Sequence, residues 1–255
     1  MKYRVSVLFL AALAAGCGST PSDQNNGAVN APAGNARSTP LPPATPTPTP
    51  IVGEKVTAQQ DVRFLGEQTP AGWTWTDPTP DGEQIRYEAK VHSLKFTIPT
   101  GRDLYGVNQS APRLMKAVEG DFQIEVRVRL NPREDYQGAG ILVYAGPERY
   151  LRFERGFGGV GGGTNGLRMD VRTGQNYRAV TTPEDAPTDA ATVDLKLLRS
   201  GNTFTAFWRP NEDSEWKEIG EYESDYPAAV EVGVIACNTG KPIPVEFYGL
   251  KLSPV

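Results

Sequence analysis

The sequence predicts an all-β domain, built as a sandwich or a barrel, and three features carry this prediction. Short runs in which apolar and polar residues alternate recur through residues 60–252, and a period of two is typical of a strand buried on one face. Turns rich in Gly, Pro, Asn and Asp separate these runs. No segment of about ten residues or more in this region shows a convincing apolar stripe with the 3.6-residue period of a helix.

The strongest strand pattern lies in the middle of the chain, at residues 119–156. Apolar residues alternate with polar ones over 122–130, the run 138–144 is apolar on both faces, and 150–154 alternates again. Short turns join these runs, so we expect three consecutive strands in an antiparallel meander with one polar face. The residues expected to face the core are Phe122, Val126, Leu151 and Phe153.

Further strands are expected on both sides of this meander. Those before it are 62–65, 85–87 and 91–98; those after it are 167–172, 192–198, 203–208, 216–219, 230–237 and 245–252. The stretch 111–118 is the one place where a helical turn is expected.

The N-terminus predicts export and lipid attachment. Residues 1–16 combine a basic start with an apolar run that is too short to span a bilayer, as in a secretory signal peptide. The end of this segment, Leu13-Ala14-Ala15-Gly16-Cys17, resembles the bacterial lipobox, in which the Cys is acylated and becomes the mature N-terminus. Ala14 departs from the commonest lipobox pattern, which has Leu three residues before the Cys. The alternative is an ordinary signal peptide followed by a chance Cys.

Acylation of Cys17 is the better interpretation, and it predicts a location. Several acyl chains, each contributing ~0.8 kcal/mol per buried CH2, would hold the protein firmly to a membrane. We therefore expect a protein of the bacterial cell envelope. The outer membrane is expected if the cell has one, because Gly18 rather than Asp follows the Cys; otherwise we expect the outer face of the plasma membrane.

Residues 17–54 are expected to form a disordered tether. Ser, Asn, Gly, Ala, Thr and Pro dominate this segment, and its end, 40–50, is Pro-Leu-Pro-Pro-Ala-Thr-Pro-Thr-Pro-Thr-Pro. So few apolar residues cannot offset the entropy lost on folding. The tether either holds the domain away from the membrane or is a spacer without a length requirement. The remaining residues, 55–255, are numerous enough for one domain with a sizeable core.

Composition argues against several classes of site. Residues 55–255 contain 23 basic and 28 acidic residues with the signs interspersed, whereas a nucleic-acid groove needs clustered Lys and Arg. Only Cys17 and Cys237 occur, so no intramolecular disulfide is expected, and Cys237 ends an apolar run that predicts a buried thiol. A single His, His92, cannot build a His-rich zinc site or a catalytic triad with a nearby nucleophile elbow.

No cofactor is expected either. Residues 156–161 match G-x-G-x-x-G, but this stretch joins two strands and opens no helix, so it predicts a Gly-rich loop at the sheet rim rather than a nucleotide site. No Asp-x-Asp-x-Asp loop marks a calcium site, although a structural calcium ion would need only loop carboxylates and carbonyls.

A series of short motifs carries a resemblance to a known family. In order they are Gly72-Trp-Thr-Trp75, Asp103-Leu-Tyr105, Ala111-Pro-Arg-Leu114, Gly120-Asp-Phe122, Asp135-Tyr-Gln-Gly-Ala-Gly140, Tyr150-Leu-Arg-Phe-Glu-Arg-Gly156, Arg199-Ser-Gly-Asn-Thr-Phe204 and Val232-Gly-Val-Ile235. This order resembles the concanavalin A-like lectin/glucanase superfamily, and most closely its uncharacterised bacterial branch, which is similar to the C-terminal sandwich of family 43 glycosidases. The resemblance implies an antiparallel two-sheet jelly-roll sandwich. It does not choose a function, because the superfamily includes lectins, hydrolases and structural modules.

Hydrolysis is the weaker functional alternative. A glycosidase needs two carboxylates about 5–9 Å apart, and glucanases of this superfamily carry them as Glu-x-Asp-x-x-Glu, a string that is absent here. Glu125 and Glu154 both stand beside arginines, which would lower their pKa values, the opposite of what a general acid requires.

The polar face of the meander and the following strand is the candidate binding site. Guanidinium and carboxylate groups can pair with sugar hydroxyls, and an aromatic ring can stack on the C–H face of a sugar. The candidate residues are Tyr150, Arg152, Glu154, Arg168, Asp170 and Trp75. Gln123, Glu125, Arg127 and Arg172 are expected on the same face. The alternatives are a solvated face of cross-strand ion pairs and, for Trp75, packing in the core. If the face binds sugar, Arg152→Ala or Glu154→Ala should abolish binding with little change in stability.

Together these features predict a lipid-anchored lipoprotein, facing the surface or the periplasm, whose sandwich binds carbohydrate without catalysis. Its expected partners are a membrane, through the lipid, and a polysaccharide, but neither nucleic acid nor nucleotide. The alternatives are a structural or partner-binding module of the envelope, and a glycoside hydrolase or lyase.

Overall fold

The computed structural model describes residues 49–255, with the exception of 65–67, 79–84 and 160–162. The predicted signal peptide at 1–16, the acylated Cys17 and the tether as far as residue 48 lie outside the described residues, so they stay predictions. Within the described part of the chain, no helix is long and apolar enough to cross a membrane.

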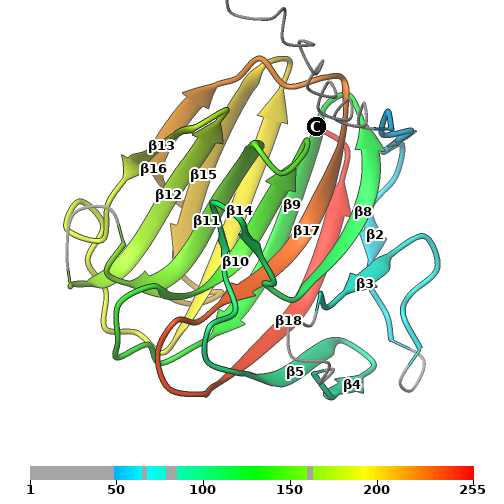
Figure 1. Ribbon diagram of the computed structural model, residues 1–255. Coiled ribbons are helices and arrows are strands. Elements are labelled where there is room, and N and C mark those ends of the chain that lie inside the picture. Colours follow the sequence, from blue (N-terminus) through cyan, green and yellow to red (C-terminus); the bar gives the residue numbers. More distant parts are fainter. Residues whose placement is uncertain (1–48, 65–67, 79–84, 160–162) are drawn as a thin grey trace, which may run out of the picture. The chain divides into compact units, whose positions relative to one another are not determined.

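Two eight-stranded sheets form a sandwich (Figure 1), which confirms the predicted all-β, two-sheet architecture. Sheet A has the order β1-β8-β17-β10-β11-β12-β13, with β3 also paired to β8. Its strands are β1 (Glu54–Lys55), β3 (Thr74–Thr76), β8 (Arg113–Glu119), β10 (Gln137–Tyr144), β11 (Arg149–Phe157), β12 (Asn165–Thr173), β13 (Asn176–Thr181) and β17 (Ala229–Cys237). Neighbouring strands are antiparallel, except that β1 runs parallel to β8.

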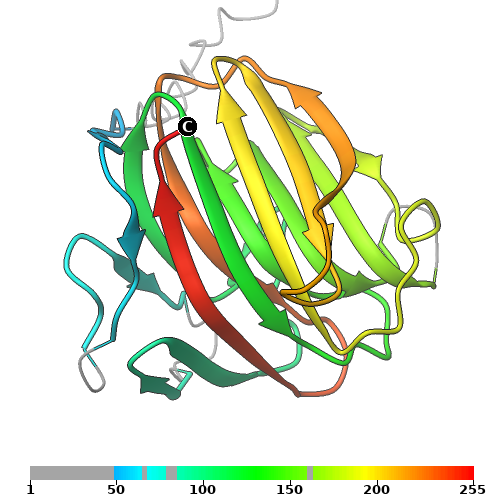
Figure 2. The same ribbon diagram turned by 180° about the vertical axis from the view of Figure 1, so that it is seen from behind.

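Sheet B has the order β16-β15-β14-β9-β18-β5-β4, with β2 paired to β18. Its strands are β2 (Gln60–Asp61), β4 (Tyr87–Lys90), β5 (Ser93–Ile98), β9 (Phe122–Arg129), β14 (Thr192–Ser200), β15 (Thr203–Arg209), β16 (Lys217–Glu223) and β18 (Ile243–Ser253). Figure 2 shows this sheet from outside, with β14 in yellow, β9 in green and β18 in red. A separate short hairpin consists of β6 (Leu104–Tyr105) and β7 (Asn108–Gln109).

Three local predictions are wrong. The strand expected at 62–65 is absent from its described residues, because β2 ends at Asp61 and residues 62–64 are not in a strand. Residues 111–118 form no helical turn, because β8 begins at Arg113 and pairs along its length with β17. The strands at 122–130, 138–144 and 150–154 do not form one meander. β9 pairs with β14 and β18 in sheet B, whereas β10 pairs with β11 and β17 in sheet A. Alternation shows that one face of a strand is buried, but it does not show which strands lie beside it.

The main core lies between the sheets, where the predicted residues Phe122, Val126, Leu151 and Phe153 are all buried. A second, smaller apolar cluster lies on the other face of sheet A, and it contains Leu104, Ala111, Met115, Leu142, Tyr150, Ile235 and Cys237. Sheet A is therefore covered on both faces, which explains why β10 is apolar on both of them. Cys237 is buried, as the sequence predicts.

Candidate functional site

A pocket of about 360 Å³ lies on the outer face of sheet A. β11 and β12 contribute its floor, and the surrounding segments contribute its walls. The lining residues are Asp103, Tyr105, Tyr136, Arg152, Gly159, Arg168, Asp170, Tyr177 and Thr239. This pocket, which we call the sheet A pocket, contains three of the residues proposed from the sequence.

The floor is a network of buried opposite charges. Arg152 and Glu154 lie two residues apart on β11 and so face the same side, as do Arg168 and Asp170 on β12. The strand register places Arg152 opposite Asp170 and Glu154 opposite Arg168. Arg168 Nη2 lies 2.8 Å and Arg168 Nε 2.9 Å from Glu154 Oε2. Arg152 Nη2 lies 3.6 Å from Asp170 Oδ2. None of these four side chains is more than 6% exposed.

Gly138 of β10 makes room for this network. A Cβ atom on Gly138 would lie 2.5 Å from Arg168 Nη2 and 3.1 Å from Glu154 Oε2. Gly138 therefore leaves the space that the side chains of Arg168 and Glu154 occupy, whereas a Cβ atom on Gly140 would lie 2.0 Å from the backbone oxygen of Phe153.

Tyr177 of β13 closes the network on one side. Its hydroxyl donates to Asp170 Oδ2 at 3.0 Å and accepts from Arg152 Nη2. The Arg152 guanidinium also lies 5.4 Å from the centre of the Tyr177 ring, within the range of a cation–π interaction. Asp103, from the segment before β6, accepts from Arg152 Nη1 at 3.3 Å.

Two carboxylates of this network, Asp170 in the floor and Glu154 beneath it, have pKa values shifted in opposite directions. Burial acts to raise the pKa of Glu154, but the positive charges of Arg168 and Arg152 outweigh it, so this pKa is lowered. Burial raises the pKa of Asp170 above its ordinary value, despite the same two arginines. Burial also raises the pKa of Tyr177 well above its usual range, so the hydroxyl keeps its proton.

The structure corrects the expected exposure of this face. Arg152, Glu154, Arg168 and Asp170 were expected at a surface with little influence on stability, but all four are buried. The reason is that segments remote in sequence cover sheet A here. Replacing Arg152 or Glu154 is therefore expected to destabilise the domain, because it leaves a buried charge without its partner.

Two further candidates do not belong to the pocket. Tyr150 is fully buried in the smaller apolar cluster, and its hydroxyl donates to Leu104 O at 2.6 Å, so its ring cannot stack on a ligand. Trp75 packs on the main core, 5.0 Å from the ring of Tyr87 and 5.3 Å from that of Phe96. The alternative of core packing is the one that the structure supports for Trp75.

Sequence reasoning missed the aromatic walls of the pocket. Tyr105 is 56% exposed and Tyr136 is 49% exposed. Tyr136 also has a positive φ of 64°, which is unusual for a residue with a side chain. Both residues stand in motifs that carried the family resemblance, Asp103-Leu-Tyr105 and Asp135-Tyr-Gln-Gly-Ala-Gly140. Tyr177 gave no comparable signal, because β13 was not predicted.

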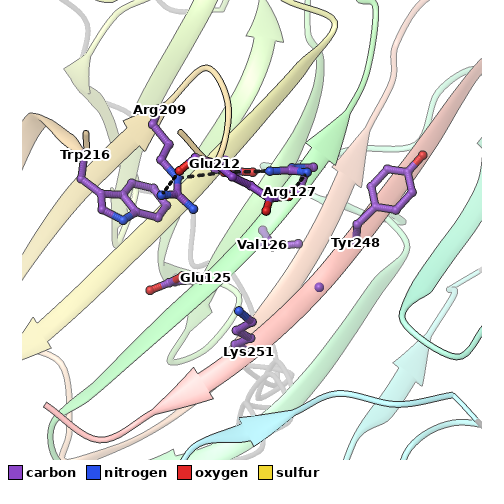
Figure 3. Close-up of a pocket in the computed structure, with 10 residues that line it drawn as sticks. Glu125, Val126, Arg127, Arg209, Glu212, Trp216, Tyr248 and Lys251 are labelled. Atoms are coloured by element: carbon purple, nitrogen blue, oxygen red, sulfur yellow. Dashed lines mark hydrogen bonds and ion pairs between the residues drawn. The ribbon is translucent and has the colours of Figure 1, made fainter. Parts of the chain in front are cut away.

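A second hollow lies on the outer face of sheet B and has about 220 Å³ of space. Figure 3 shows the side chains of Arg127, Arg209 and Glu212 reaching toward one another in this hollow. Arg127 Nε lies 2.6 Å from Asp194 Oδ1, Arg127 Nη1 lies 2.6 Å from Glu212 Oε1, and Arg209 Nε lies 2.9 Å from Asp194 Oδ2. The Arg209 guanidinium lies 4.5 Å from the centre of the Trp216 ring.

Gln123, Glu125 and Arg127 therefore face away from Arg152 and Glu154, on the other sheet. The expected single polar face is in fact two faces on opposite sides of the molecule. Among the described residues, no group of three or more His, Cys, Asp or Glu side chains is placed to hold a metal ion.

The fold and the pocket define a β-sandwich domain with a preformed cavity on one outer face. The DUF1349 family, described as a protein of unknown function, matches residues 79–255, so the chain belongs to this family. A search of curated proteins finds no significant match.

Three solved structures illustrate the kinds of protein that have a similar fold. A functionally unknown protein from Saccharomyces cerevisiae is 15% identical with a TM-score of 0.59, and the match covers 72% of this chain and 97% of that one. The GH43 protein BlXynB from Bacillus licheniformis is 12% identical with a TM-score of 0.59, covering 78% of this chain and 39% of that one. The xyloglucan PUL GH43B protein of Bacteroides ovatus is 14% identical with a TM-score of 0.55, covering 85% and 41%.

This chain thus spans about two fifths of the GH43 proteins. At these identities the likeness shows the fold alone, and it confirms the resemblance to GH43 sandwich domains at that level.

Proposed function

We propose that this protein is a lipid-anchored component of the bacterial cell envelope whose sandwich domain binds carbohydrate without turnover. The observation that carries the proposal is the sheet A pocket, in which exposed tyrosines stand above a buried floor of paired charges. Lipid attachment is supported by the signal-like segment at 1–16 and by Cys17.

The walls and the floor suit different parts of a sugar. Tyr105 and Tyr136 line the pocket and are about half exposed, so their rings are aromatic groups on which the C–H face of a sugar could pack. The oxygens of Asp103 and Asp170 accept hydrogen bonds, and the N–H groups of Arg152 and Arg168 donate them. A largely preformed pocket with a few convergent polar groups is the usual form of a small-ligand site.

Turnover is less well supported. Asp170, with its raised pKa, has one property of a general acid, and this single observation favours the hydrolase alternative. Its carboxylate, however, accepts from Tyr177 and lies 3.6 Å from both Arg152 and Arg168. Glu154, the second carboxylate, is wholly buried beneath the floor, where a substrate cannot reach it.

The test is calorimetric titration of the full-length chain in detergent with a panel of soluble polysaccharides, together with an assay for released reducing ends. We expect binding to at least one of them and no release. Tyr136→Ala should abolish the binding, whereas Trp216→Ala, on sheet B, should leave it unchanged. Release of reducing ends that Asp170→Asn abolishes would instead establish the hydrolase.

Anchoring is tested separately by labelling growing cells with palmitate. The wild-type chain should be labelled and partition with membranes, and Cys17→Ser should not be labelled. Labelling that survives this substitution would overturn the lipoprotein proposal while leaving the carbohydrate proposal intact.

A further inference from the structure

We propose that the sheet A pocket takes the terminal unit of an uncharged saccharide chain and rejects chains that end in a uronic acid. This inference rests on the proposed function and narrows it in two respects: the charge of the ligand, and the part of the chain that is bound.

The positive and negative charges that line the pocket are equal in number. Two guanidinium groups, of Arg152 and Arg168, and two carboxylates, of Asp103 and Asp170, line the pocket. Two further charges lie close by: Glu154 beneath the floor, and Arg172 on the same face of β12 as Arg168 and Asp170. One is negative and the other positive, so the net charge stays at zero when both are included. A pocket without excess charge offers a charged ligand no net attraction to offset the loss of its hydration.

Both floor guanidinium groups are already ion-paired, Arg152 with Asp103 and Asp170, and Arg168 with Glu154 and Asp170. Arg152 Nη1 donates to Asp103 and Cys237, and Arg152 Nη2 donates to Tyr177. Arg168 donates to Glu154 and, through Nη1, to Gly158 O at 3.2 Å. Arg152 Nε has no hydrogen-bond partner among the described residues, but it is buried and lies 3.9 Å from Glu154 Oε2. An incoming carboxylate would therefore meet Asp103 and Asp170, and each cation that it could approach already has a carboxylate partner.

A neutral hydroxyl faces no such obstacle. It can donate to a carboxylate oxygen that already accepts from an arginine, because a carboxylate accepts several hydrogen bonds. The floor then keeps its own ion pairs, and the ligand adds to them rather than replacing them.

The walls of the pocket favour binding of the end of a saccharide chain. Gly159, Tyr136 and Thr239 stand at the end of the floor where β11 ends. Gly159 follows β11, Tyr136 precedes β10 and Thr239 follows β17. Asp103 and Tyr105 stand at the other end of β11. Leu104, which lies between them in the chain, accepts a hydrogen bond from Tyr150, and Tyr150 precedes Arg152 on this face of β11. Tyr177 of β13 forms a further wall beside β12. The floor is thus bounded at both ends of β11, so an extended polymer has no straight path across it.

The size of the pocket agrees with this shape. Its volume of about 360 Å³ is near the lower limit of the ~300–1,000 Å³ typical of ligand sites. Such a volume suits a short terminal segment rather than a long stretch of polymer.

The wall at Tyr136 is held in place without ligand. Gln137 Oε1 accepts from the backbone N–H groups of Arg133 and Glu134, and Thr239 Oγ1 donates to Asp135 O at 2.9 Å. These bonds fix the turn in which Tyr136 adopts its positive φ. Backbone strain that the surroundings enforce is typical of ligand clamps.

The experiment is calorimetric titration of the full-length chain in detergent with matched probes. The neutral probes are xylohexaose, cellohexaose and mannohexaose, the acidic probe is a galacturonic acid hexamer, and the parent polymers are supplied at equal mass. We expect at least one neutral hexamer to bind at least tenfold more tightly than the acidic hexamer. We also expect its parent polymer to bind in proportion to its chain ends rather than to its mass.

Each other outcome has a definite meaning. Equal or tighter binding of the acidic hexamer overturns the charge inference. Equal binding of polymer and hexamer at equal mass overturns end recognition. In both cases carbohydrate binding itself stands. No heat with any probe, or binding that Tyr136→Ala leaves unchanged while Trp216→Ala abolishes it, overturns the proposed function and this inference with it.

Discussion

The outer faces of the two sheets carry the same kinds of residue in two different environments. On sheet A, Arg168 and Glu154 form an ion pair in which neither side chain is more than 2% exposed. On sheet B, Arg127 is 30% exposed and its partner Glu212 is 71% exposed. The difference arises because Asp103, Tyr177 and the residue that follows β11, Gly158, lie against the charges of sheet A, whereas Arg127 and Glu212 on sheet B remain open to water, although Asp194 beside them is only 7% exposed.

This difference is the reason for placing the proposed binding site on sheet A rather than on sheet B. Exposed ion pairs contribute little to stability and hold no fixed geometry. Buried and mutually hydrogen-bonded charges are held in place by their surroundings, which is what a preorganised floor requires. The hollow on sheet B also has aromatic residues beside its charges, Trp216 and Tyr248, but the arginines of its ion pairs are 22–30% exposed.

The largest effect should come from breaking the buried network. Glu154→Ala should lower the free energy of unfolding by ~3–5 kcal/mol, because the buried Arg168 guanidinium loses the carboxylate 2.8 Å away and keeps only the more distant Asp170, at 3.6 Å, as an ion-pair partner. Arg127→Ala is the matched change on sheet B and should cost less than ~1 kcal/mol, since Asp194 keeps Arg209 as a partner. Urea unfolding measures both changes. Equal losses would show that the two faces do not differ as described.

The second largest loss of stability is expected when a side chain fills the space beside Gly138. Gly138→Ala should destabilise the domain by ~1–3 kcal/mol, as overpacking usually does, because its Cβ would press on Arg168. Ala139→Gly, at the adjacent position whose side chain faces the core, should cost less, at ~1 kcal/mol. A neutral Gly138→Ala substitution would mean that Arg168 can move aside and that the floor is not rigid.

A smaller effect is expected in the pH dependence of unfolding. The pKa of Glu154 is lowered in the folded state, so its stabilising contribution is present above its unfolded-state pKa and is lost as the pH falls through the folded value. The pKa of Asp170 is raised, so its ionisation costs stability, and this cost disappears as the pH falls. Thermal unfolding in acid should therefore show a weaker acid-induced loss for Glu154→Gln and a stronger one for Asp170→Asn. Identical profiles for the two variants would contradict the opposite shifts.

The smallest effect on stability is expected at the rim. Tyr136→Gly should be more stable than Tyr136→Ala by ~1 kcal/mol, because Gly adopts a positive φ at no steric cost. At Tyr105, which is not among the residues with positive φ, the order of the Gly and Ala variants should be reversed. Thermal unfolding of the four variants tests this, and a lower stability of Tyr136→Gly would show that the turn is not strained.

The sequence by itself determined the architecture and the faces of individual strands. Alternation identified Phe122, Val126, Leu151 and Phe153 as core residues, because the direction of a side chain from a strand is a local property of the backbone. It also placed Arg152 with Glu154 and Arg168 with Asp170 on shared faces, and the motifs around Tyr105 and Tyr136 indicated the fold.

Only the tertiary structure decided which strands lie together and what covers them. The separation of β9 from β10, the burial of Tyr150 under Leu104 and the burial of the charged floor all depend on contacts between segments far apart in the chain. A strand pattern reports whether a face is apolar, but a polar face can be either solvated or closed over by a distant hairpin. Whether the face is solvated or covered depends on the free energy of the whole network, in which Arg168 pairs with Glu154 and Arg152 pairs with Asp103. A local sequence pattern does not contain this free energy.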